Sequence, residues 1–193
     1  MSTSMRTAIE HTFMRRWTFL LFAIWAGLLT FGLYGRSLTF PFFSDDFFQL
    51  PFLAAHSLPR LWQTAEGLFF FRPLAFTLWK GLAAAGYDPA LFHLANLLLH
   101  WLNGVLVALL TARLWANGRS ARPRAAVAGT LFLLYPFSYE GVAWVAAVMH
   151  PQFLALLLLA ILGYLRAFYP TAPISRRAVG AGRRSAWRAP CWR

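Results

Sequence analysis

Two adjacent carboxylates, Asp45 and Asp46, are the side chains in this sequence that are best suited to chemistry. They lie among phenylalanines, where an unpaired carboxylate is costly to bury. Apolar neighbours tune the pKa of such a group, so one interpretation is a catalytic base or metal ligand at a membrane surface. The other is helix capping, with Ser44 as the N-cap. The spacing does not decide, because adjacent helical residues point about 100° apart.

A second polar group consists of His93, Asn96 and His100, whose spacing of i, i+3 and i+7 puts them on one helix face. Polar contact between helices is the favoured interpretation. The functional interpretation is a lining for a headgroup or phosphate site near the outer leaflet, for which His93 is better placed than His100. A zinc site is disfavoured, because no carboxylate or cysteine on this helix completes a ligand set.

Glu140 is the only acidic residue after Asp88. It follows a stretch of aromatic residues that contains Pro136. One interpretation is an acid near the start of the next helix, where negative charge is stabilising. The other is a second acidic group that faces the loop carrying Asp45 and Asp46.

The composition indicates which class of protein must position these residues. The 193-residue chain is 59% hydrophobic and only 12% charged, with a mean hydropathy of +0.53. Soluble domains carry about 25% charged residues, so about half of the usual charge is missing. Disorder is excluded by the apolar content, and the single cysteine, Cys191, excludes a disulfide framework. The net charge of +12 therefore indicates a membrane protein with asymmetric loops.

Hydropathy predicts an all-α, polytopic membrane bundle with about four transmembrane helices. These are expected at residues 17–35, 91–115, 125–138 and 151–169. The first stretch has no charge from Trp17 to Tyr34 and, at ~1.5 Å per residue, covers about 27 Å of the ~30 Å hydrocarbon core. The third stretch is the shortest, and Pro136 marks its expected end.

The charge of the polar segments changes with each predicted crossing. The net charges are +2 for residues 1–16, zero for 36–89, +4 for 113–124, −1 for 138–150 and +7 for 166–193. By the positive-inside rule, we expect the N-terminus, residues 113–124 and the tail to be cytoplasmic in a cell-membrane protein. Scattered basic flanks of this kind do not form a nucleic-acid-binding stripe, so no nucleic-acid partner is predicted.

The first outward loop, residues 36–90, is too long and too aromatic for a simple connector. We expect it to lie on the bilayer as short interfacial helices. One helix begins at Ser44. Another begins with Pro73 at its first position and stops at about Ala85, before Gly86.

The order of these features resembles the N-terminal region of GT-C-fold membrane glycosyltransferases. The likeness is greatest to protein O-mannosyltransferase-like proteins, including those with transmembrane and tetratricopeptide-repeat parts. It covers about residues 17–169, which correspond to roughly the first third of a family member. The matching residues are Asp45, Asp46, Arg72, Pro73, Leu74, Phe92, His93, Asn96, His100, Pro136 and Glu140.

The resemblance implies transfer of a sugar from a polyprenyl-phosphate or dolichyl-phosphate carrier to an acceptor on the outer face. It implies that Asp45 or Asp46 is the base on the acceptor hydroxyl and that the anomeric centre inverts. Arg72 would pair with the carrier phosphate, as a guanidinium can in a bidentate way. A snorkelling or capping role is the alternative for Arg72. His93 and Glu140 are the other candidate substrate-binding residues.

Two departures from the family pattern qualify this expectation. Tyr135 precedes Pro136 where histidine is common, and the chain reads Val148-Met149-His150 where Arg-x-Asp often occurs. These favour a bacterial homologue of unknown substrate over the animal-type mannosyltransferases.

The basic stretch at residues 170–193 has no hydrophobic period. Family members continue through further spans, so we expect a truncated product that is too short to be active alone. A disordered basic tail held at anionic lipids is the alternative.

A non-enzymatic four-span accessory or assembly protein is the competing hypothesis, with the aromatic loop as its contact surface. A small transporter is disfavoured, since no internal repeat is detectable. No cofactor is predicted, a divalent cation is left open, and neither the sugar nor the acceptor follows from the sequence.

Overall fold

The structure is a computed structural model that describes residues 3–115 and 121–169, with side chains from residue 17 onward. All regular secondary structure in this part of the chain is helical, which confirms the predicted all-α class. The basic tail predicted at residues 170–193 lies outside the described residues.

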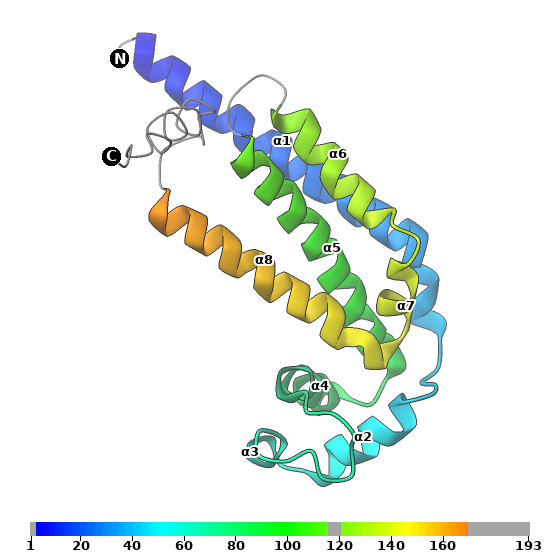
Figure 1. Ribbon diagram of the computed structural model, residues 1–193. Helices are drawn as coiled ribbons and strands as arrows, with labels where there is room; N and C mark the ends of the chain where they lie inside the picture. Colours follow the sequence, from blue (N-terminus) through cyan, green and yellow to red (C-terminus); the bar gives the residue numbers. More distant parts are fainter. Residues whose placement is uncertain (1–2, 116–120, 170–193) are drawn as a thin grey trace, which may run out of the picture.

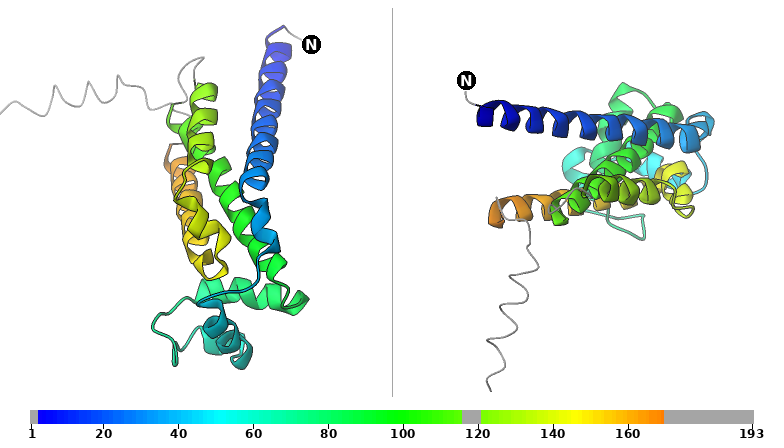
Figure 2. Two further views of the ribbon diagram at one scale, coloured as in Figure 1. Left: turned by 90° about the vertical axis from the view of Figure 1, so that its right-hand side faces the viewer. Right: turned by 90° about the horizontal axis from the view of Figure 1, so that it is seen from above.

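Three long segments form the body of the molecule (Figures 1 and 2). Helix α1 (Thr3–Tyr34) continues into the 3-10 turn η1 (Gly35–Thr39), α5 covers Pro89–Leu114, and η2 (Val145–Val148) leads into α8 (Met149–Phe168). Three stretches within them are long and apolar enough to cross a membrane. These are Trp17–Thr39, Pro89–Leu114 and Val145–Phe168. They correspond to three of the four predicted spans.

The remaining predicted span, at residues 125–138, corresponds to the shorter helix α6 (Ala121–Leu133). Its 13 residues rise about 20 Å, which is less than the ~30 Å hydrocarbon thickness. The count of four spans is therefore not confirmed. Helix α6 ends before Pro136 because a proline disfavours helical backbone at the residue that precedes it.

Two glycines allow α6 to pack closely against α5. A Cβ atom built on Gly104 of α5 would lie 2.6 Å from Cδ2 of Leu133. One built on Gly129 of α6 would lie 2.8 Å from the carbonyl oxygen of Gly104 and 2.6 Å from Cζ of Phe22. Small residues at such crossings let helix backbones approach each other in membrane proteins.

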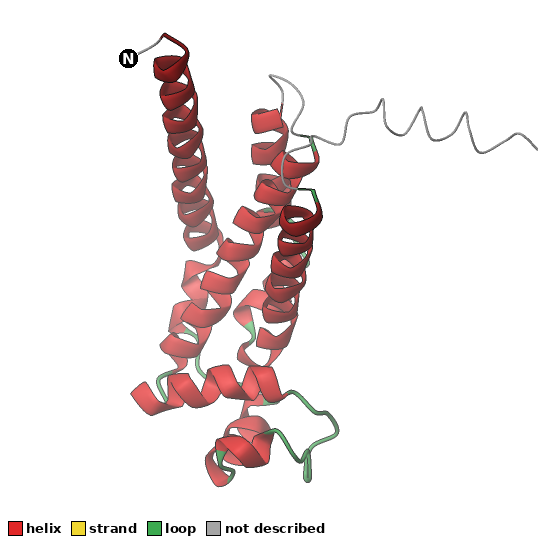
Figure 3. Cartoon of the chain, turned by 90° about the vertical axis from the view of Figure 1, so that its left-hand side faces the viewer, coloured by secondary structure: helices red, strands yellow, loops and turns green. Residues whose placement is uncertain are grey.

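The loop at residues 36–90 folds as short helices at one end of the long ones (Figure 3). Helices α2 (Asp46–Ala55) and α3 (Leu58–Leu61) are followed by α4 (Pro73–Ala85), which lies across the ends of the body helices. Helix α4 begins with Pro73 and ends before Gly86, where φ is +131°, a conformation that favours glycine.

An apolar core fixes this loop to the body of the molecule. Buried side chains of α2 and α4, among them Leu53, Phe76 and Trp79, pack in one cluster with Phe92 of α5 and Val145 of η2. The Lys80 ammonium of α4 donates hydrogen bonds to the carbonyls of Leu53 (2.7 Å) and His56 (2.8 Å). It therefore satisfies the free carbonyls at the C-terminal end of α2.

Candidate active site

Asp46 is the buried member of the carboxylate pair. Its side chain is fully buried, and its Oδ2 accepts a 3.0 Å hydrogen bond from the backbone N–H of Phe43. Burial raises the pKa of the Asp46 carboxyl above its ordinary 3.8, while the hydrogen bond from Phe43 acts in the opposite direction. Asp46 thus ties the start of α2 to the segment that precedes it.

Asp45 is only partly buried and lines a cavity, so the two carboxylates have separate surroundings. The expectation that Ser44 is the N-cap is wrong, because Asp45 is the N-cap residue of α2 and makes no side-chain capping bond. The reason is local backbone conformation. Ser44 has a φ of +53°, in the left-handed region, and the turn there delays the helix by one residue.

Arg72, the residue that precedes α4, lines the same cavity. Its Nη1 donates to the carbonyl of Ala146 (3.4 Å), and its guanidinium carbon lies 3.7 Å from the centre of the Phe70 ring. Burial lowers the pKa of the Arg72 guanidinium, and the negative charge of Asp45 acts in the opposite direction. Arg72 is therefore held in a partly dry position near a carboxylate.

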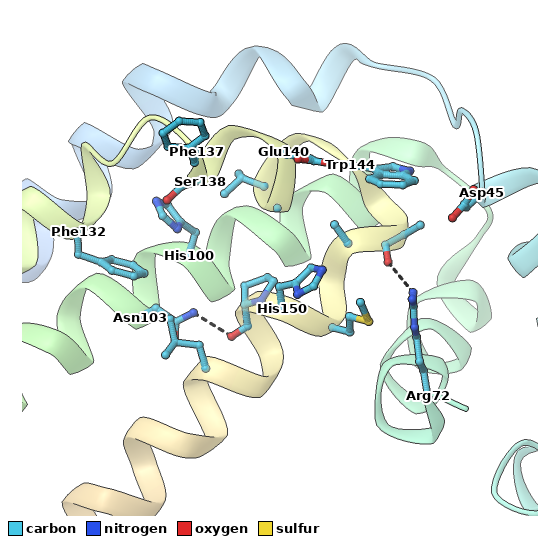
Figure 4. Close-up of a pocket in the computed structure, with 17 residues that line it drawn as sticks. Asp45, Arg72, His100, Asn103, Phe132, Phe137, Ser138, Glu140, Trp144 and His150 are labelled. Atoms are coloured by element: carbon cyan, nitrogen blue, oxygen red, sulfur yellow. Dashed lines mark hydrogen bonds between the residues drawn. The ribbon is translucent and has the colours of Figure 1, made fainter. Parts of the chain in front are cut away.

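The cavity has a volume of about 460 Å³, which is in the usual range for ligand sites. Figure 4 shows its lining, which comes from α5, from α6, α8 and the segment that joins them, and from Asp45 and Arg72 of the loop at residues 36–90. The polar lining residues are Asp45, Arg72, His100, Asn103, Ser138, Glu140 and His150. It therefore brings together three predicted site residues, Asp45, Arg72 and Glu140.

A polar stripe on α5 holds the walls of this cavity in place. Asn96 Nδ2 donates to the carbonyl of Trp144 and Asn103 Nδ2 to that of Pro151, both at 2.8 Å. These bonds join α5 to the segment that begins α8. Asn103 bonds to Pro151 of α8, whereas Asn96, for which a contact between helices is predicted, bonds to Trp144, which precedes η2 and lies in no helix. His93 is fully buried, packs edge-on against Phe40, and is not among the residues that line the cavity.

Sequence reasoning missed Asn103 and His150 as cavity residues. Asn103 continues the spacing of His93, Asn96 and His100 by another three residues, a signal that was available in the sequence. His150 had no such signal, because its place at the cavity depends on how η2 leads into α8.

No group of three His, Cys, Asp or Glu side chains among the described residues could hold a metal ion. The described residues thus identify no ligands for the divalent cation that the sequence left open. What the cavity does offer is a carboxylate that can take a proton and a guanidinium that can bind a phosphate.

Comparison of the chain with protein-family models, with curated proteins and with solved structures finds no match.

Proposed function

We propose that this chain is a membrane glycosyltransferase, or a portion of one, that transfers a sugar from a polyprenyl-phosphate donor to an acceptor. One observation carries the proposal: the carboxylate of Asp45 and the guanidinium of Arg72 line the same cavity. The donor phosphate needs a cation, and the acceptor hydroxyl needs a base. The aromatic loop and the apolar helices suit a donor that is anchored in lipid.

In the proposed reaction, Asp45 accepts the proton of the acceptor hydroxyl while the hydroxyl oxygen bonds to the anomeric carbon. The bond between that carbon and the phosphate oxygen breaks, and its electron pair leaves with the polyprenyl phosphate. Arg72 stabilises the charge on the departing phosphate. A single displacement of this kind inverts the anomeric centre.

The cavity faces outward from the cell membrane in this proposal. The start of α1, the end of α5 and the start of α6 lie at one end of the molecule and α2–α4 at the other (Figure 1), and Asp45 and Arg72 of the cavity are the residues that precede α2 and α4. The described basic residues Arg113, Arg122 and Arg124 belong to the first end, which the positive-inside rule assigns to the cytoplasm. Helix α6, with its flanking residues, then makes the fourth crossing.

The test uses the full 193-residue chain in lipid nanodiscs with a labelled prenyl-phosphate hexose. We expect Asp45→Asn to keep donor binding and, in a form of the protein that transfers the sugar, to lower transfer by at least about a hundredfold, the usual effect of losing a general base. We expect Arg72→Gln to weaken donor binding. The matched control is Glu66→Gln, a carboxylate of the same loop that is 81% exposed and lies 3.6 Å from Arg60.

Two results would contradict the proposal. One is a wild-type chain that binds no prenyl-phosphate hexose. The other is a wild type that transfers the sugar together with an Asp45→Asn variant that transfers it no more slowly than Glu66→Gln.

An accessory protein without enzymatic activity is the second candidate, and the exposed aromatic side chains of the outward loop favour it. Phe47 and Phe48 of α2 are 64% and 72% exposed, and Phe69 is fully exposed. Large exposed apolar patches mark contacts with a protein or a membrane. In this case a stoichiometric partner co-purifies with the chain, and no donor binds.

A further inference from the structure

The two ends of the cavity differ in chemistry. Figure 4 shows Asp45 and Arg72 at one end, His100 and Asn103 at the other, and His150 between them. The end away from the charged pair offers an imidazole, an amide and the hydroxyl of Ser138. The roles proposed for Asp45 as the base and for Arg72 as the phosphate contact do not involve this second end.

Two buried polar atoms at this end have no hydrogen-bond partner among the described residues. They are Nε2 of His100, a residue that is 3% exposed, and Oδ1 of Asn103, which is fully buried. The bond from Asn103 Nδ2 to Pro151 fixes the orientation of the amide. Because an unpaired buried polar atom is unfavourable, these atoms indicate that a ligand with hydrogen-bonding groups belongs here.

Aromatic rings at the same end narrow the ligand class. Phe132 and Phe137 line it, and the Phe132 ring centre lies 5.2 Å from that of His100. A sugar ring presents an apolar C–H face to an aromatic ring, and its hydroxyl groups both donate and accept hydrogen bonds. An anionic group would instead need a cation, and Arg72 is at the opposite end (Figure 4).

We propose that the end of the cavity lined by His100, Asn103 and Phe132 is a subsite for a hexose ring. The inference rests on the proposed function, because a donor phosphate on Arg72 puts the anomeric carbon beside Asp45 and directs the sugar toward His150 and His100. A sugar acceptor offers the same chemistry as the sugar of the donor. The ring is therefore the recognised group, and its source is decided by experiment.

Three probes test the subsite on the full chain in nanodiscs. They are a short-chain prenyl phosphate, the same molecule carrying one hexose (mannose, glucose or galactose in separate assays), and the methyl glycoside of each hexose. For the wild type we expect tighter binding of a hexose-bearing prenyl phosphate than of the bare phosphate. Competition by the methyl glycoside without any effect of the phosphate would instead identify a sugar acceptor as the source of the ring.

The variants separate the two ends of the cavity. His100→Phe and Asn103→Leu should each reduce the preference for the hexose-bearing probe by about tenfold, the effect of one lost buried hydrogen bond. His100→Gln keeps a hydrogen-bonding group and should retain most of the preference. Asn96→Leu is matched to Asn103→Leu, since it loses an equal bond to the α8 side but does not line the cavity.

The outcomes also separate this inference from the proposed function. If the wild type binds both prenyl phosphates equally and no methyl glycoside, the unpaired atoms hold only water and the subsite is overturned. Binding that is lost in Arg72→Gln would still support the proposed function. An equal loss of hexose preference in Asn96→Leu and Asn103→Leu would likewise overturn the subsite. No binding of any probe would contradict both.

Discussion

Asp46 makes the stability of the site depend on pH. Burial raises the pKa of its carboxyl, so the folded chain binds the proton more tightly than the unfolded chain. The stabilisation is complete below the unfolded pKa and is lost as the pH rises through the folded pKa. We expect Asp46→Asn to remove this loss, because an asparagine side chain can still accept the hydrogen bond from Phe43.

The measurement is the thermal unfolding midpoint of both proteins, followed by tryptophan fluorescence between about pH 4 and pH 7. Relative to the wild type, the midpoint of Asp46→Asn should rise with pH. A constant difference across this interval would show that Asp46 does not titrate with folding.

At the same scale, the sequence predicts Asp45 and Asp46 as candidate site residues, but it does not predict that Asp46 is buried and that Asp45 lines the cavity. Asp45 and Asp46 share their neighbours and their chemistry. The left-handed backbone at Ser44 separates them, and serine carries no strong signal for that conformation. Arg72 and Glu140 could be predicted as candidate site residues from the resemblance to GT-C-fold glycosyltransferases, whereas their meeting at one cavity depends on tertiary packing.

At the scale of elements, the contact between α5 and α6 depends on Gly129. We expect Gly129→Ala to destabilise the chain by about 1–3 kcal/mol, the usual effect of overpacking. The added Cβ would lie 2.8 Å from the Gly104 carbonyl, which belongs to a helix backbone that has little freedom to move.

Gly32→Ala is the matched control for this prediction. It lies in α1, and a Cβ built on it has no atom within 4 Å, so we expect no loss of stability. The check is the melting temperature of each purified variant in detergent, followed by size-exclusion chromatography. Equal melting temperatures for the two variants would mean that the α5–α6 contact is not close-packed.

Local signals explain why some elements are predictable and others are not. The bounds of α4 follow from Pro73 at its start and Gly86 after its end, both of which act within one turn. The length of α6 does not follow in this way. Its apolar residues continue past Leu133, but α6 ends there because Pro136, three residues further on, disfavours helical backbone before it.

At the scale of the whole molecule, the proposed topology can be tested with single cysteines. After Cys191→Ser removes the native thiol, Ser120→Cys and Tyr139→Cys place one thiol on either side of α6. We expect an impermeant maleimide to label Tyr139→Cys in intact cells, and Ser120→Cys only after permeabilisation. Labelling of both in intact cells would mean that α6 does not cross the membrane.

The polar side chains of α5 are synthesised before the carbonyls that accept their hydrogen bonds. The carbonyls that accept from Asn96 and Asn103 each belong to a residue 48 positions further along the chain. Helix α5 therefore leaves the ribosome before either acceptor, and it enters the insertion machinery with both amides unpaired. The two side-chain hydrogen bonds of α5 form only after residues 144–151 have been synthesised. A nascent chain halted after α6 would therefore present α5 with both amides unpaired to membrane quality control.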